Sequence, residues 1–161
     1  MGYRSNVGYV IVFRSPNKSV FSDRPEPENP EKAFAEFSHF LEHILSFTKD
    51  ESMRPMVEDE FRYMQFDKNK LTISYQAENI KWYEDYPFVR WHEELLNKVS
   101  TYDTGNYRFL RIGEELNDNE EESHDPTAFM YDYIGLRREV VIEDEGDSMH
   151  DLIQEEEEEQ P

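Results

Sequence analysis

Charge is distributed unevenly along this chain of 161 residues. Residues 1–112 carry a net charge of −3, whereas residues 113–161 carry −17 of the total of −20. A dense surface of like charge destabilises a compact state by self-repulsion. The sequence therefore predicts a nearly neutral folded body, followed by an acidic region that either serves a basic partner or does not fold.

The acidic excess also limits the class of ligand. DNA, RNA and anionic membranes are bound through Lys and Arg side chains, which displace counterions or meet anionic headgroups. We therefore expect no direct nucleic-acid ligand and no membrane. The expected partner is a basic protein surface, with a nucleic-acid-binding protein as the favoured kind. Complementary charge would accelerate association and make it sensitive to salt.

Aromatic residues supply the material for a core. They make up 14% of the chain, against an apolar fraction of 37%, and they run from Tyr3 to Tyr133. Each buried aromatic side chain removes about 150–250 Å² from water. We therefore predict one domain over residues 1–142 and an acidic, disordered tail over residues 143–161, because a block such as Glu155–Glu159 repels itself.

Apolar periodicity predicts seven elements in the order β-α-β-β-α-β-β. These are strands over 7–14, 61–66, 70–76 and 107–112, helices over 30–48 and 82–99, and a last extended segment over 129–142. The acidic stretch 117–126 is expected to be a surface loop, and 50–60 a polar connection. The fold class is α+β: an antiparallel sheet with two helices on one face. A split β-α-β, ferredoxin-like arrangement is the simplest such topology.

Local signals place the strands and helix faces. The strand over 7–14 is rich in β-branched and aromatic residues, which predicts a central strand buried on both faces. Asn29-Pro30 reads as a helix N-cap and first position. The predicted apolar stripe of the first helix is Phe34, Phe37, Phe40, Leu41, Ile44 and Leu45. That of the second is Phe88, Trp91, Leu95, Leu96 and Val99.

Acidic residues of the last third form the candidate partner-binding surface. They are Glu114, Glu115, Asp118, Glu120, Glu121, Glu122, Asp125, Glu143, Asp144 and Glu145. Calcium loops need oxygen ligands at fixed offsets, and these acids come in blocks without such a pattern. A surface that contacts a partner and a surface that only keeps the protein in solution remain the two interpretations.

Histidines supply the alternative hypotheses. Glu36, His39 and His43 have helical spacing, but both histidines point away from the apolar stripe, which favours a solvated helix face over a metal site. His92 lies close to the second stripe, which favours a hydrogen-bonded core histidine, because a general base needs a partner nucleophile. We expect no enzyme activity and no cofactor. A metal-binding protein or small hydrolase that uses these histidines is the first alternative, and a structural subunit is the second.

Three segments together resemble a group of small, mostly uncharacterised proteins of tailed bacteriophages. They are the start at 2–7, GYRSNV, the stretch at 81–87, KWYEDYP, and the stretch at 107–114, YRFLRIGE. The resemblance covers about residues 1–140 and transfers no active site. It implies an accessory protein that acts inside an infected bacterium. By analogy, such proteins often bind host or defence proteins, some of them by resembling DNA, so a DNA mimic that inhibits its target is one form of the expected function.

The compartment expected from composition agrees with that context. The chain has no cysteine, which excludes disulfide bonds and thiolate metal sites. Its first residues show no basic-then-apolar signal segment. The longest apolar run, residues 9–13, is far shorter than the roughly 20 residues that span a bilayer. We therefore expect a cytoplasmic protein.

Overall fold

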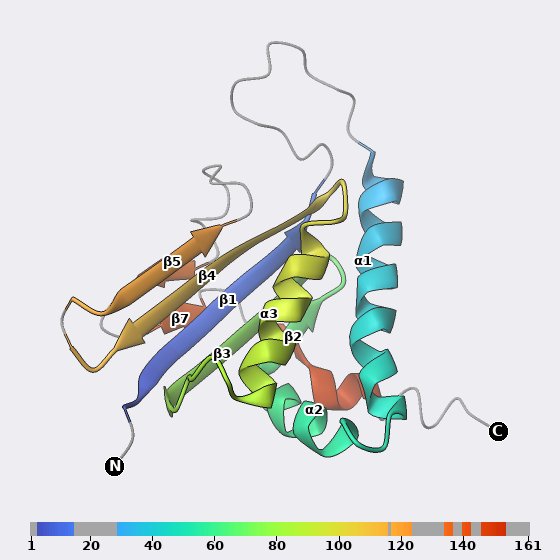
Figure 1. Ribbon diagram of the computed structural model, residues 1–161. Coiled ribbons are helices and arrows are strands. Elements are labelled where there is room, and N and C mark those ends of the chain that lie inside the picture. The colour runs from blue at the N-terminus through green and yellow to red at the C-terminus, as the bar shows by residue number, and fades with distance from the viewer. Residues whose placement is uncertain are drawn as a thin grey trace, which may run out of the picture.

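A six-stranded antiparallel sheet forms the middle of the molecule (Figure 1). The computed structural model describes residues 3–14, 29–115, 117–123, 134–136, 140–142 and 146–153. The sheet order is β5-β4-β1-β3-β2-β8. The strands are β1 (Ser5–Phe13), β2 (Met64–Asp67), β3 (Thr72–Ile80), β4 (Gly105–Gly113), β5 (Asn119–Ser123) and β8 (Asp147–Ser148).

The central position predicted for the first strand is confirmed. β1 pairs along its length with both β3 and β4. Eight of its nine residues are buried. Val7, Tyr9, Ile11 and Phe13 face the main core, whereas Val10 and Val12 are buried outside that cluster, on the other side of the sheet. Alternation along a strand thus serves two buried faces at once.

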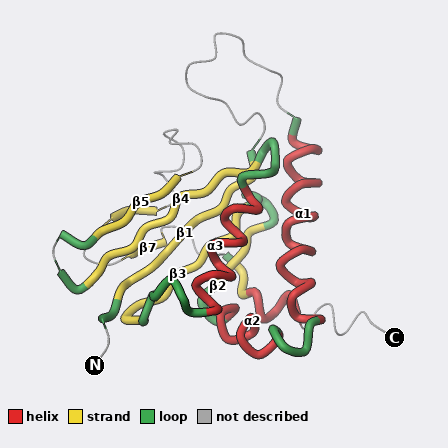
Figure 2. The backbone as a smooth tube through the Cα atoms, in the orientation of Figure 1, coloured by secondary structure: helices red, strands yellow, loops and turns green. Residues whose placement is uncertain are grey.

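Helices cover one face of the sheet, as predicted (Figures 1 and 2). They are α1 (Pro30–Ser46), the short 3-10 helix η1 (Phe47–Lys49), α2 (Arg54–Phe61) and α3 (Pro87–Val99). The predicted cap of α1 is confirmed, because the Asn29 side chain accepts a hydrogen bond from the backbone N–H of Lys32 at 3.1 Å. The predicted Trp91 stripe of α3 is buried except at Phe88, which is intermediate.

Phe34 is a correction to the predicted stripe of α1. Its relative exposure is 55%, whereas Phe37, Phe40 and Ile44 are at most 1% exposed. Phe34 and Leu41 are seven residues apart and therefore point to nearly the same side of α1, at the edge of the stripe. Phe34, however, lies in the first turns of the helix. Ala33 takes the buried position there.

The polar connection predicted over 50–60 is also wrong, because α2 forms within it. Pro55 is tolerated in the first turn of a helix, where its missing N–H costs nothing. Val57 and Phe61 are four residues apart and bury one side of α2. Two apolar positions are too few to produce a periodic signal, so the helix was hidden in the sequence. Phe61 therefore ends a helix, and β2 begins only at Met64.

Two further corrections concern the acidic loop and the last extended segment. The acidic surface loop over 117–126 contains the strand β5, paired with β4. The single extended segment over 129–142 instead contains β6 (Ile134–Leu136) and β7 (Val140–Ile142), which pair antiparallel. β7 lies against β1, β3 and β4, so this two-stranded sheet forms a third layer.

The disordered tail predicted from residue 143 does not hold for residues 146–153. β8 pairs with β2 through Ser148 and Asp147, at the sheet edge opposite β5. The helical turn that follows buries Met149, Leu152 and Ile153, with exposures of 0%, 6% and 8%. Three apolar side chains cannot form a core of their own, but here they join a cluster that the rest of the fold already supplies. Residues 143–145 and 154–161 lie outside the described residues.

Candidate functional site

The acidic strand β5 is held on the sheet by two arginines of β4. Asp and Glu are normally depleted in strands, so a strand of sequence NEEES needs partners. Arg108 Nη2 lies 2.9 Å from Glu121 Oε1 on one face, and Arg111 Nη2 lies 2.9 Å from Glu120 Oε1 on the other. Opposite charges across neighbouring strands stabilise the pairing. The side chains of the two arginines are only 6% and 10% exposed, so the cations lie beneath their carboxylates.

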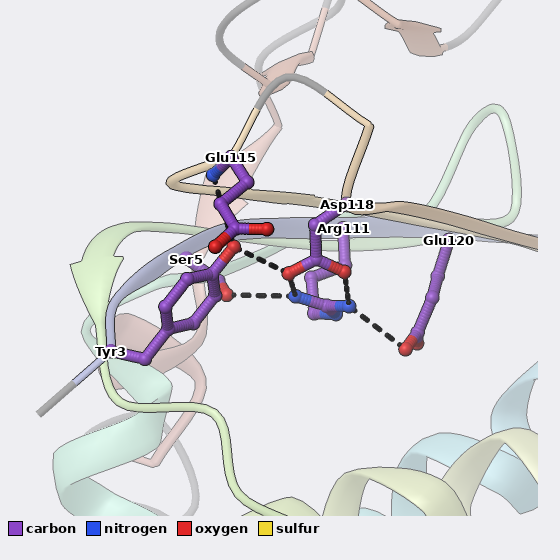
Figure 3. A network of polar contacts seen from close by, with 6 residues as sticks. All are labelled: Tyr3, Ser5, Arg111, Glu115, Asp118 and Glu120. Carbon is purple, nitrogen blue, oxygen red and sulfur yellow. Dashed lines mark hydrogen bonds and ion pairs between the residues drawn. The ribbon is translucent and has the colours of Figure 1, made fainter.

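Arg111 is the centre of a polar network that we call the edge clamp: Tyr3, Ser5, Arg111, Asp118 and Glu120 (Figure 3). The guanidinium donates to both carboxylate oxygens of Asp118, at 2.7 and 3.1 Å, and to Ser5 Oγ at 3.0 Å. A bidentate pair of this kind fixes orientation as well as distance. Hydrogen bonds from Arg111 and then Tyr3 lower the pKa of Asp118 from 3.8 to about 2.

Tyr3 closes the turn between β4 and β5. Its hydroxyl donates to Asp118 Oδ2 and accepts the backbone N–H of Glu115. The hydrogen bond to Asp118 raises the pKa of Tyr3. A Cβ atom at Gly113 would lie 2.1 Å from Asp118 Oδ2 and 2.3 Å from Tyr3 Oη, so a side chain there would displace the hydrogen bond between these two groups. Tyr3 thus ties Asp118 and the backbone of Glu115 to the residues that precede β1.

Carboxylates gather where β5 approaches α3. Burial raises the pKa of Glu93 on α3, and the neighbouring charges of Glu84, Glu122 and Glu120 raise it further, in that order. Arg90 opposes them. We call these four residues, Glu84, Glu93, Glu120 and Glu122, the acidic face. All four are exposed, and together they concentrate negative charge on the helix-bearing side of the sheet edge.

Glu122 is fixed by a tyrosine of β4. The hydroxyl of Tyr107 donates to Glu122 Oε1 at 2.7 Å. Burial, followed by this hydrogen bond, raises the pKa of Tyr107. Glu120 and Glu122 therefore each receive a donor from β4, from Arg111 and Tyr107 respectively. The two β5 members of the acidic face, Glu120 and Glu122, are therefore held from beneath by donors of β4.

Half-buried aromatic residues border the acidic face. The ring of Tyr83 lies 5.1 Å from that of Tyr86, which lies 5.9 Å from Phe88. Glu84 follows Tyr83 directly in the chain. Tyrosine is enriched among the residues that carry binding energy at protein interfaces. Aromatic rings in edge-to-face and tilted contact, beside exposed carboxylates, are suited to contacting a cationic, planar group such as a guanidinium.

The predicted site residues fall into three groups. Asp118, Glu120 and Glu122 accept hydrogen bonds from Arg111 or Tyr107 of β4, whereas Glu121 pairs with Arg108 on the opposite face of the sheet. Glu114 and Glu115 are exposed on the turn, where Glu114 Oε1 accepts the backbone N–H of Arg4 at 2.7 Å. The others, Asp125, Glu143, Asp144 and Glu145, lie outside the described residues.

Sequence reasoning missed the supporting residues. Arg108 and Arg111 sit in an otherwise apolar strand, and long cations are rarely buried without partners. Two arginines three residues apart in such a strand could have indicated carboxylates on the neighbouring strand. Glu84 and Glu93 gave no signal of their own, because only the tertiary packing of α3 brings them near β5.

The histidines occupy two different settings. His39 is exposed, as predicted, and its Nδ1 lies 2.6 Å from the Tyr102 hydroxyl. Glu36 accepts from the backbone N–H and the hydroxyl of Thr104, which turns it toward a loop. Among the described residues, no group of three His, Cys, Asp or Glu is placed to hold a metal ion. His92 is fully buried, and its ring nitrogens contact Tyr9 and Glu60.

Comparisons with known proteins found no matching family model, no matching curated protein and no matching solved structure. Within the part of the chain that the structure describes, no helix combines the length and apolar character needed to cross a membrane.

Proposed function

We propose that this chain is a non-enzymatic binding protein whose acidic face engages a basic surface of a nucleic-acid-binding protein. One observation carries the proposal: four exposed carboxylates, those of Glu84, Glu93, Glu120 and Glu122, gather where β5 approaches α3. Burial raises the pKa of Glu93, and the charges of its three neighbours raise it further, which agrees with a local concentration of negative charge. Charge that only keeps a protein in solution can be spread over the whole surface and does not have to be clustered at one place.

Rigidity supports binding over simple solubility. The edge clamp and Tyr107 fix β5 from beneath, so the carboxylates are ordered before a partner arrives. Ordered groups lose less conformational entropy on binding. Alternate residues of a strand lie about 6.8 Å apart. This is comparable to the through-space separation of neighbouring phosphates along one DNA strand, because the winding of the backbone adds to its axial rise of about 3.4 Å. Glu120 and Glu122 can thus take the place of phosphates, which is how a DNA mimic inhibits its target.

The resemblance of three segments to bacteriophage accessory proteins supplies the proposed context, the cytoplasm of an infected bacterium, with a host or defence protein as the target. We further propose that β4-β1-β3-β2, with α1 after β1 and α3 after β3, is a split β-α-β, ferredoxin-like core. The strand order and the antiparallel pairing support this assignment.

Two variants of equal charge separate a specific face from net charge. The acidic-face variant carries Glu93→Gln, Glu120→Gln and Glu122→Gln, which keep the hydrogen-bonding oxygens. The control carries Glu31→Gln, Glu42→Gln and Glu94→Gln, all exposed on α1 and α3. Each variant removes three negative charges. Both are used, beside the unmodified chain, to capture proteins from a bacterial lysate at low and high salt.

The expected result is a captured nucleic-acid-binding protein that is lost at high salt and lost with the acidic-face variant, but retained by the control. Competition by duplex DNA for that partner is expected as well, because both ligands would occupy one basic surface. Equal loss with both variants would show that only net charge matters, and would overturn the proposal.

A further inference from the structure

A second polar network lies inside the core. It consists of Tyr9 on β1, Glu60 on α2, Tyr75 on β3 and His92 on α3, and we call it the core lock. Tyr9, Tyr75 and His92 are fully buried and Glu60 is 6% exposed. Four elements far apart in the sequence thus meet through polar groups. Such a network is costly to bury unless each donor and acceptor is satisfied.

The hydrogen bonds of the core lock define one proton arrangement. The hydroxyl of Tyr75 donates to Glu60 Oε1 at 3.1 Å, and His92 Nε2 lies 2.8 Å from the same oxygen. A carboxylate only accepts, so Nε2 carries a hydrogen and donates it. In a neutral imidazole Nδ1 then accepts, and it lies 2.7 Å from the hydroxyl of Tyr9, which donates. Every group is satisfied when His92 is neutral.

A proton added to His92 breaks this arrangement. Nδ1 becomes a donor and faces the Tyr9 hydroxyl, which must then turn its own hydrogen elsewhere. The contacts of Tyr9 within the described residues include no second acceptor for that hydrogen. A buried donor left without a partner destabilises the folded state.

The surroundings of His92 also disfavour its protonation. The titratable groups that face the ring are Tyr9 from β1, Tyr75 from β3 and Glu60 from α2. The other neighbours are the rings of Trp82 and Trp91, which carry no charge. Burial lowers the pKa of His92 from its ordinary 6.5, and this outweighs Glu60, which raises it.

We propose that the core lock is a pH-sensitive device: it holds α2 and α3 on the sheet while His92 is neutral, and it weakens on acidification. The sign follows from linkage. The unfolded chain takes up a proton on this histidine as pH falls through about 6.5, whereas the folded chain resists it. Stability is therefore complete above that pH, and it falls as pH drops toward the value in the folded state.

Chemical denaturation of the full chain at a series of pH values tests the device. Relative to His92→Gln, which cannot titrate, the folding equilibrium constant of the unmodified chain should fall between pH 7 and pH 5.5, by up to about tenfold. His39→Gln, at an exposed site, should retain that fall. An equal pH dependence in the unmodified chain and in His92→Gln would overturn the proposal, as would stability that rises on acidification.

Two tyrosine variants test the mechanism. Tyr9→Phe removes the hydroxyl hydrogen that protonation of Nδ1 would leave without an acceptor. Nδ1 then lacks a partner in both protonation states, so the acid sensitivity should be smaller, whereas Tyr75→Phe should leave most of it. Equal effects of the two variants would contradict the mechanism. If His92→Gln does not fold, the imidazole nitrogen shifts of the unmodified chain decide the matter. A ring that carries its hydrogen on Nε2 and is protonated only below about pH 6.5, the ordinary pKa of a histidine, is expected, and a ring protonated above pH 6.5 would overturn the proposal.

Discussion

The edge clamp and the core lock lie on the same face of the sheet, and they differ in what satisfies their charges. In the edge clamp a guanidinium, Arg111, meets the carboxylates of Asp118 and Glu120 near solvent. In the core lock a carboxylate, Glu60, is held by a tyrosine and a histidine, away from water. The edge clamp holds carboxylates at the surface, where a partner can reach them. The core lock joins α2 and α3 to the sheet through buried hydrogen bonds, whose donors and acceptors depend on the protonation of His92.

The largest expected effect is at the core lock. Glu60→Ala removes the acceptor of two buried donors, Tyr75 and His92, and each stranded donor costs about 1–3 kcal/mol. We therefore expect a loss of about 2–6 kcal/mol in the free energy of unfolding, measured by chemical denaturation at pH 7.5. Glu60→Gln, which keeps an acceptor oxygen, should lose less. A loss below about 0.5 kcal/mol for Glu60→Ala would show that the network contributes nothing.

The burial of Met149 provides an apolar contribution to stability with which both networks can be compared. Met149 is 0% exposed in the segment that follows β8. Met149→Ala should cost about 2–5 kcal/mol, the range for truncating a buried large side chain. Unlike the contribution of the core lock, this loss should not change between pH 7.5 and pH 5.5. A melting temperature equal to that of the unmodified chain would show that residues 146–153 do not dock on the core.

The edge clamp should matter less to stability. Arg111→Met keeps much of the buried volume but leaves Asp118 and Glu120 without their shared cation. Hydrogen bonds to charged groups contribute about 1.5–3 kcal/mol, so we expect a loss of about that size in the free energy of unfolding. Arg111→Lys should recover only part of it, because an ammonium cannot make the bidentate pair. Full recovery with lysine would contradict the importance of the fork geometry.

The two networks should also separate by pH. The pKa of Asp118 falls from 3.8 in the unfolded chain to about 2 in the folded protein, so a depressed carboxyl stabilises the fold above pH 4. That contribution should be constant from neutral pH to about 4 and disappear between about 4 and 2. The difference in stability between Asp118→Asn and the unmodified chain, followed over this range, measures it. A difference that already changes between pH 7 and 5.5 would contradict this assignment.

The smallest effect is expected at the surface of α1. His39 is exposed, and His39→Ala should change the free energy of unfolding by no more than about 0.5 kcal/mol, as surface substitutions do. Thermal unfolding at pH 7.5 is sufficient to measure it. A loss of several kcal/mol would mean that its contact with Tyr102 supports the core, and would weaken the contrast between buried and exposed polar groups.

The sequence predicted the layers better than it predicted the site. Long apolar patterns produced β1, α1 and α3, because burial of a stripe dominates in elements of this length. Short elements were not predicted, because α2 has only two buried apolar residues and β5 has none. A strand such as β5 forms only because Arg108 and Arg111 are already in place on β4, which is a tertiary effect. The acidic residues were found from charge, but their focus near Glu93 depends on how α3 packs.

Hydrogen–deuterium exchange of the captured partner complex tests the binding proposal most directly. Amide exchange of the full chain is compared with and without the partner. The account predicts slower exchange in β5 and in the part of α3 near Glu93, with no change along α1. The same pattern should be absent with the acidic-face variant. Protection of α1 or of the segment around β8, with β5 unchanged, would contradict the claim that the acidic face is the binding surface.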